Sequence, residues 1–184
     1  MDEVVEQAMA KWPNVPHCFG WMGLSVRGHW YMRDAAAQAA GPFSSKHVGA
    51  KGSLLQHEKM IAFIGRNYGC DGIGQWFFQN GPQRVYVELE STPWVLRIGD
   101  DFCIHTHTGL PTLCTACFVD EQGWVYMSTP LGLGLVHTLD VVRVANAMES
   151  DRWPVTGVLR SDLPVLFSYV VSPAAQQHIA LRQQ

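Results

Sequence analysis

This sequence has little charge, and that shortage already limits what it can bind. Charged residues make up 16% of the 184 residues, and the formal net charge is −3. Lysine and arginine are scattered along the chain rather than clustered, so we expect no basic surface that could gather phosphates. The sequence therefore predicts no nucleic-acid partner.

Long apolar runs and abundant cysteine are also missing. No apolar run reaches the roughly eighteen residues of a membrane-spanning helix, so no membrane partner is expected. The opening stretch, MDEVVEQAMAKW, begins with acids and lacks the basic and then apolar pattern of a signal peptide. Five cysteines are an odd number and too few for a disulfide scaffold, which favours reduced thiols. These observations predict a cytoplasmic protein.

Motifs that would name a reaction are missing as well. The sequence contains neither a Gly-x-Ser-x-Gly elbow nor a phosphate-binding Walker loop, and GLGLVH lacks the third glycine of a dinucleotide loop. His57-Glu58 is followed by Ile61 where a zinc-protease helix needs histidine. Glu88 and Glu90 share one face of a predicted strand, where a solvated edge explains them better than a catalytic pair.

The elements that can be predicted indicate an α+β fold. Hydrophobic residues make up 47% of the chain, which is ordinary for a globular domain. Apolar residues at helical spacing predict helices over 2–11, 53–67 and 138–149, with Ser53 and Thr138 as candidate caps. Alternating segments between glycine- and proline-containing turns predict many strands, and the last two are expected at 156–160 and 164–171. We therefore expect a largely antiparallel sheet with two or three short helices, and a loop over 35–52.

Three segments of the chain resemble one another. GHWYMRD, GQWFFQN and GWVYMST begin at Gly28, Gly74 and Gly123, and each follows its glycine with aromatic residues. This similarity is consistent with an internal repeat inside a single compact unit over 1–184, with similar lobes over 15–98 and 99–184. The alternative is that any turn before an aromatic strand has this appearance.

The first half of the chain resembles a known family. The resemblance rests on Pro16 with Cys18, on Gly28 with Trp30, on the helix after Ser53, on Trp76-Phe77, and on the run from Pro82 to Trp94. Over Pro16 to Ile98 the sequence resembles a family of proteobacterial cytosolic domains of unknown function, with a duplicated Gly-x-Trp-aromatic strand motif and a Pro-x-x-Val-x-Val-Glu-x-Glu-x-x-Pro-aromatic run. The resemblance implies an α+β fold with repeated motifs and a part in signalling. It supplies no catalytic residues.

One stretch, RIGDDFCIHTHTGLPTLCTAC, gathers side chains that could bind a metal. A hairpin that turns at Gly109-Leu110 would place His105 opposite Cys114, with Cys103 and His107 on the same face. These four residues are candidate zinc ligands. A turn with one more residue would remove the pairing, and Cys117 is expected on the opposite face. Alternatively, the cysteines pack as small apolar groups while both histidines face water.

Together these observations favour a non-enzymatic ligand- or protein-binding module with a regulatory or signalling role. Its partner would be an unidentified small molecule or protein, and no cofactor is expected. The alternative is a zinc-binding protein or a metal-dependent hydrolase that uses His105, His107 and Cys114. The sequence does not indicate an oligomeric state.

Overall fold

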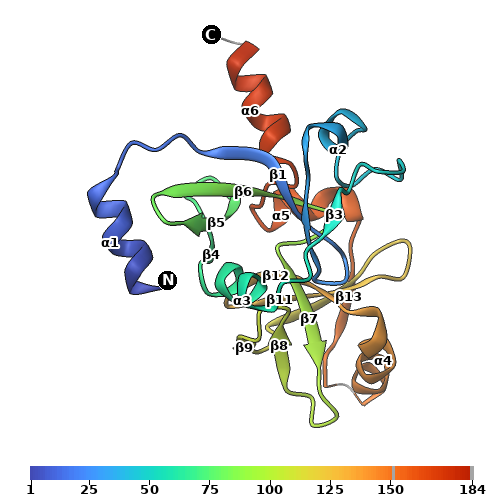
Figure 1. Cartoon of the computed structure of the whole chain (residues 1–184). Coiled ribbons are helices and arrows are strands. Elements are labelled where there is room, and N and C mark those ends of the chain that lie inside the picture. The colour runs from blue at the N-terminus through green and yellow to red at the C-terminus, as the bar shows by residue number, and fades with distance from the viewer. Residues whose placement is uncertain (151, 183–184) are drawn as a thin grey trace. The chain divides into compact units, whose positions relative to one another are not determined.

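The computed structural model of the chain describes residues 1–150 and 152–182, which form two units with one β-sheet each (Figure 1). The first unit comprises Met1–Ser25, His29–Glu90 and Tyr169–Gln184, and the second comprises Val26–Gly28 and Ser91–Ser168. The division therefore falls after Glu90 rather than at residue 98, and the C-terminal segment belongs to the first unit. Residues 183–184, which end the expected second lobe, lie outside the described residues.

The sheet of the first unit has six strands in the order β3-β2-β1-β6-β5-β4. All neighbouring pairs are antiparallel except β1 and β6, which run parallel. The strands are β1 (Cys18–Leu24), β2 (Trp30–Met32), β3 (Ser53–Leu54), β4 (Tyr68–Cys70), β5 (Trp76–Asn80) and β6 (Gln83–Leu89).

The sheet of the second unit has seven strands in the order β13-β10-β11-β12-β7-β8-β9. Here β7 runs parallel to β12, and β13 runs parallel to β10, while the other neighbours are antiparallel. The strands are β7 (Trp94–Ile98), β8 (Ile104–Thr106), β9 (Pro111–Thr112), β10 (Ala116–Val119), β11 (Val125–Thr129), β12 (Gly132–Val136) and β13 (Val155–Gly157). With helices beside these mixed but largely antiparallel sheets, the predicted α+β class is confirmed.

The two sheets share one topology. Read from β9 to β10, the second sheet repeats the strand order of the first, with each strand number raised by six. The registers agree as well, because the pair Met22↔Met32 corresponds to Leu96↔Thr106, with both partners shifted by 74 positions. In the other half, Phe77↔Tyr86 corresponds to Tyr126↔Leu135, with both partners shifted by 49 positions.

The three similar glycine segments begin with the same kind of hairpin turn. Gly28, Gly74 and Gly123 all have left-handed φ angles, of 75°, 85° and 80°. In the turn before β5, Asp71 accepts a hydrogen bond through Oδ1 from the backbone N–H of Gln75 at 2.9 Å. In the turn before β11, the Oδ1 atom of Asp120 accepts from the N–H of Trp124 at 2.8 Å. The glycine supplies the left-handed residue that three-residue hairpin loops require.

The helices differ from the sequence expectation in number and position. The structure has α1 (Glu3–Lys11), α2 (Ala35–Ala39), α3 (Glu58–Arg66), α4 (Val141–Glu149), α5 (Leu163–Leu166) and α6 (Pro173–Arg182). Helices were expected for α1, α3 and α4, whereas α2 lies in the expected loop and α5 replaces the strand expected at 164–171. Within the described residues, no helix is long and apolar enough to cross a membrane.

Helix α3 begins later than the spacing of its apolar residues suggested. Ser53-Leu54 forms β3 because it pairs with Tyr31-Met32 of β2, and Leu54 is 43% exposed. The helix is capped instead by His57, whose Nδ1 atom accepts a hydrogen bond from the N–H of Met60 at 3.3 Å. The predicted start of the helix at Ser53 was therefore wrong.

Candidate functional site

The first unit contains a cavity of about 700 Å³ between α3 and strands of its sheet. Most of its lining is apolar and comes from β1, β2, α3, β5 and β6: Cys18, Trp21, Met22, Met32, Met60, Phe63, Ile64, Phe78 and Val85. Its polar lining is smaller: Arg33, Asp34, Ser53, His57, Lys59 and Asn80. The volume lies within the range of roughly 300–1,000 Å³ that is usual for small-molecule pockets.

The floor of the cavity is built by strand pairing. Phe78 of β5 lies directly opposite Val85 of β6, and both side chains are buried. Met22 of β1 is buried beside them, and Ile64 of α3 is fully buried on the opposite side. Because alternate residues of a strand face the same side, the sheet presents one apolar surface to the helix.

The rim of the cavity exposes large apolar side chains to solvent. Trp21, Met32 and Met60 are 52%, 50% and 45% exposed, and they come from β1, β2 and α3 respectively. Trp21 and Met22 are neighbours, yet both line the cavity, at a register shift in β1 where Gly20 has a φ of 78°. Exposed apolar groups at the edge of a concave surface are typical of ligand-binding sites.

Arg33, a charged residue of the lining, holds the surrounding backbone in place. Arg33 is 4% exposed, and its guanidinium donates hydrogen bonds to the carbonyl oxygens of Gly20, Ala37, Gly41 and Ala50. Burial lowers the pKa of Arg33, although the charge of Glu88 acts in the opposite direction.

Asp34 caps helix α2 by accepting from the backbone N–H of Ala37 at 2.8 Å. Among the described residues, Lys59 at the rim makes no ion pair. Lys59 is therefore the charged lining residue that is available to a ligand.

Glu88 is buried rather than solvated, so the expectation of a solvated edge was wrong for this residue. Its carboxylate accepts hydrogen bonds from Ser172 Oγ at 2.5 Å and from the backbone N–H of Ala174 at 3.0 Å. Burial raises the pKa of Glu88, and these two hydrogen bonds counteract the rise. Glu90 instead pairs with Lys51 at 2.6 Å, so the two carboxylates do not act as a pair.

The candidate zinc ligands lie on a hairpin with a different register from the expected one. His105 of β8 lies opposite Pro111 of β9, not opposite Cys114, because the chain turns between Thr106 and Leu110. His105 and Cys103 are exposed, whereas Cys114 lies beyond the end of β9 and is half-buried.

His107 has surroundings unlike those of His105. Its ring lies 5.6 Å from that of Trp94, and its Nδ1 atom accepts from the N–H of Val95 at 3.3 Å. Burial lowers the pKa of His107 to about 3.

No group of three or more His, Cys, Asp and Glu side chains suited to a metal ion occurs in the part of the chain that the structure describes. Metal binding by Cys103, His105, His107 and Cys114 stays a prediction of the sequence. The observed register removes the pairing of His105 with Cys114 on which it rested.

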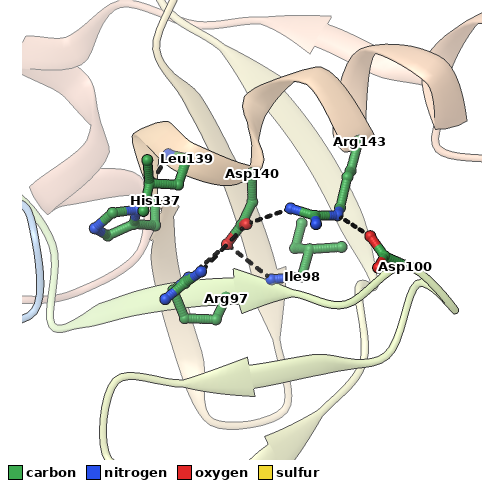
Figure 2. A network of polar contacts seen from close by, with 7 residues as sticks. All are labelled: Arg97, Ile98, Asp100, His137, Leu139, Asp140 and Arg143. Carbon is green, nitrogen blue, oxygen red and sulfur yellow. Dashed lines mark hydrogen bonds and ion pairs between the residues drawn. The ribbon is translucent and has the colours of Figure 1, made fainter.

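The second unit contains a buried carboxylate that joins α4 to β7. Figure 2 shows the side chain of Asp140, just before α4, which points toward β7 and lies between Arg97 and Arg143. Its Oδ2 atom accepts from Arg97 Nε at 2.6 Å and from the N–H of Ile98 at 3.1 Å, and its Oδ1 atom accepts from Arg143 Nη1 at 2.8 Å. Burial by itself would raise the pKa of Asp140, but these hydrogen bonds and the two arginine charges lower it. Since both of its oxygens are engaged, this network stabilises the fold.

A family model described as "Protein of unknown function (DUF2946)", for the family DUF2944, matches residues 1–182 of this sequence. The chain belongs to this family. The expected resemblance to a family of unknown function is thereby confirmed at the coarse level. No curated protein matches the chain.

Two solved structures are similar to this DUF2944 family member. A DUF1285 family protein from Silicibacter pomeroyi DSS-3, solved at 2.50 Å resolution, has 12% identity and a TM-score of 0.49, and the match covers 79% of this chain and 84% of that one. A DUF1285 family protein from Shewanella baltica OS155, solved at 1.40 Å resolution, has 14% identity and a TM-score of 0.44, and the match covers 68% of this chain and 91% of that one. Both TM-scores lie below 0.5, so these likenesses support no inference about function.

The cavity was not predicted from the sequence, although part of its lining follows a recognisable pattern. Met60, Phe63 and Ile64 follow the spacing of one helical face, which indicates a shared apolar surface. The rest of the cavity lining comes from strands that are far apart in the sequence of this DUF2944 family member, and only the pairing of these strands brings their residues together.

Proposed function

We propose that this chain is a non-enzymatic binding module whose first unit takes a small, largely apolar molecule in the cavity beneath α3. The observation that carries the proposal is a cavity of about 700 Å³ with an apolar floor and with three large apolar side chains exposed at its rim. A module of this kind would act in regulation by responding to the concentration of its ligand.

Comparison of the two sheets supports the proposal. Met22, Met32, Phe78 and Val85 correspond in register to Leu96, Thr106, Met127 and Gly134 of the second sheet. There Leu96 and Met127 are fully buried, and a Cβ atom at Gly134 would lie 2.5 Å from Leu96 Cγ. The second sheet thus fills the space that the first leaves open, so a cavity is not a necessary result of this topology. We infer that the matching registers reflect an internal duplication in which one copy acquired a binding site.

The proposal can be tested with N-phenyl-1-naphthylamine, a neutral apolar dye that fluoresces when it leaves water. We expect saturable binding of one dye per chain, together with a higher melting temperature, because a ligand that binds only the folded state stabilises it. Met60→Glu places a charge on the exposed rim and should weaken dye binding at least roughly tenfold, since burying an unpaired carboxylate is costly.

Ile73→Glu is the matched control. Ile73 is 67% exposed in the same unit and does not line the cavity, so this variant should bind the dye as the wild type does. Dye binding that is non-saturable, or that Met60→Glu and Ile73→Glu alter equally, would contradict the proposal.

A further inference from the structure

The polar groups of the cavity are concentrated on one segment of its lining. Ser53 of β3 and His57 and Lys59 at the start of α3 come from a single stretch of the chain. All three can donate hydrogen bonds: Ser53 through its hydroxyl, Lys59 through its ammonium, and His57 through Nε2, because its Nδ1 atom accepts the capping bond from Met60. The apolar floor adjoins this stretch, so the cavity is amphipathic.

The charges of the lining favour an anion at this end. Arg33 and Lys59 are cationic, and Asp34 is the one carboxylate in the described lining. Arg33 is bound to four carbonyl oxygens and Asp34 caps α2, as described above. Lys59 is exposed at the rim and remains available to an incoming group.

Resting on the proposed function, we infer that the ligand is a molecule with an apolar chain or ring system that ends in a carboxylate, held by Lys59 and His57 at the start of α3. The apolar part would lie on Met22, Phe78 and Ile64, where each methylene removed from water strengthens binding. The carboxylate would stay at the rim, where it keeps part of its hydration and gains charge-assisted hydrogen bonds.

The test compares dodecanoate with dodecanol as displacers of N-phenyl-1-naphthylamine, both below their aggregation concentrations. The two compounds share one chain and differ in the charge of the head group. We expect dodecanoate to displace the dye at roughly tenfold lower concentration than dodecanol, in line with the strength of hydrogen bonds to charged groups. Added salt should weaken dodecanoate and leave dodecanol unaffected.

Lys59→Met, which keeps an apolar stem and removes the charge, should abolish the preference by weakening dodecanoate alone. Lys46→Met removes an exposed lysine of the same unit outside the cavity and should retain the preference. Circular dichroism of each variant verifies that it is folded.

Three results would overturn the inference. They are equal displacement by acid and alcohol, a Lys59→Met variant that weakens both compounds equally, and a Lys46→Met variant that acts like Lys59→Met. In each case the dye can still bind in one saturable site, so the proposed function would stand. Absence of saturable dye binding would instead remove the proposed function.

Discussion

Arg33 and His107 occupy corresponding positions, each directly after the second strand of its sheet. Arg33 stays charged and binds four backbone carbonyl oxygens, whereas burial keeps His107 neutral beside Trp94 and Val95. The same place in the fold is therefore stabilised by a cation in one unit and by a neutral ring in the other. In mildly acidic solution the ring of His107 gains a proton only when the chain unfolds, and its contribution to stability therefore depends on pH.

We predict that His107→Gln flattens the pH dependence of stability between pH 6.5 and 4. The pKa of His107 falls from 6.5 to about 3 in the folded chain. Its neutral form therefore stabilises the fold fully above pH 6.5 and less as the pH falls, by at most about 1.4 kcal/mol per pH unit. Urea unfolding at several pH values measures how the free energy of unfolding changes with pH. In the His107→Gln variant, the contribution of His107 to this slope should be absent.

His105→Gln is the control for this measurement, because it replaces an exposed histidine of the same hairpin. Its unfolding free energy should depend on pH as that of the wild type does. Equal slopes for His107→Gln and the wild type would show that His107 already takes up its proton in the folded state.

At the scale of elements, one turn recurs before strands of both sheets, and it depends on a left-handed residue. Gly28 and Phe102 correspond in register, and their φ angles are 75° and 63°. The second sheet therefore holds a phenylalanine where the first holds a glycine. The ring of Phe102 lies 5.8 Å from that of Trp153, so packing offsets part of the backbone strain.

We predict that Gly123→Ala destabilises the chain by about 1–2 kcal/mol, which is the cost of a left-handed conformation for a residue with a Cβ atom. Gly123 has a φ of 80°, and a Cβ atom there would meet nothing within 4 Å, so the cost comes from the backbone alone. Gly157→Ala is the matched control, because Gly157 is equally uncrowded and has no left-handed φ. Thermal unfolding measures the stability of both variants. An equal loss of stability in Gly123→Ala and Gly157→Ala would contradict the proposed role of the left-handed turn residue.

Local spacing predicts some elements well and others poorly, for identifiable reasons. The helices α1 and α4 agree closely with their expected ranges because their apolar spacing is local. Ser53-Leu54 was assigned to a helix because the partner that makes it a strand, β2, cannot be read from nearby residues. In the candidate zinc hairpin, a hairpin was expected correctly, but the chain turns over the three residues 107–109 rather than over Gly109-Leu110, and this change alters every pairing.

At the scale of the whole molecule, the topology joins segments that are distant in sequence. The parallel pair of β1 and β6 and the return of Tyr169–Gln184 to the first unit were not predicted, because no local pattern encodes them. The helical half of the cavity lining was visible in the sequence, whereas the sheet half required this topology. The C-terminal segment completes the first unit through backbone bonds from Leu89 N to Val171 O and from Val170 N to Gly74 O, both 2.8 Å long.

We predict that a chain ending at Ser168 loses protection from hydrogen exchange in β5 and β6 of the first unit. Truncation removes Ser172 and Ala174, the two donors to Glu88, and leaves a buried carboxylate without them. Mass spectrometry of peptides from the exchanged protein measures the effect, and the strands β10–β12 serve as an internal reference. Equal loss of protection in both sheets would show that the C-terminal segment does not act on the first unit in particular.

A second substitution separates the carboxylate from the rest of the lost segment. In the full chain, the hydrogen bonds from Ser172 and Ala174 offset much of the cost of burying the charge, so Glu88→Gln should change the free energy of unfolding only slightly. In the truncated chain the same substitution should stabilise, since an amide without partners costs less to bury than a carboxylate. The gain in unfolding free energy from Glu88→Gln is thus expected to be larger in the truncated chain than in the full chain. If the gain is the same in both chains, the C-terminal segment contributes by packing alone, and the hydrogen bonds of Ser172 and Ala174 are not what holds it.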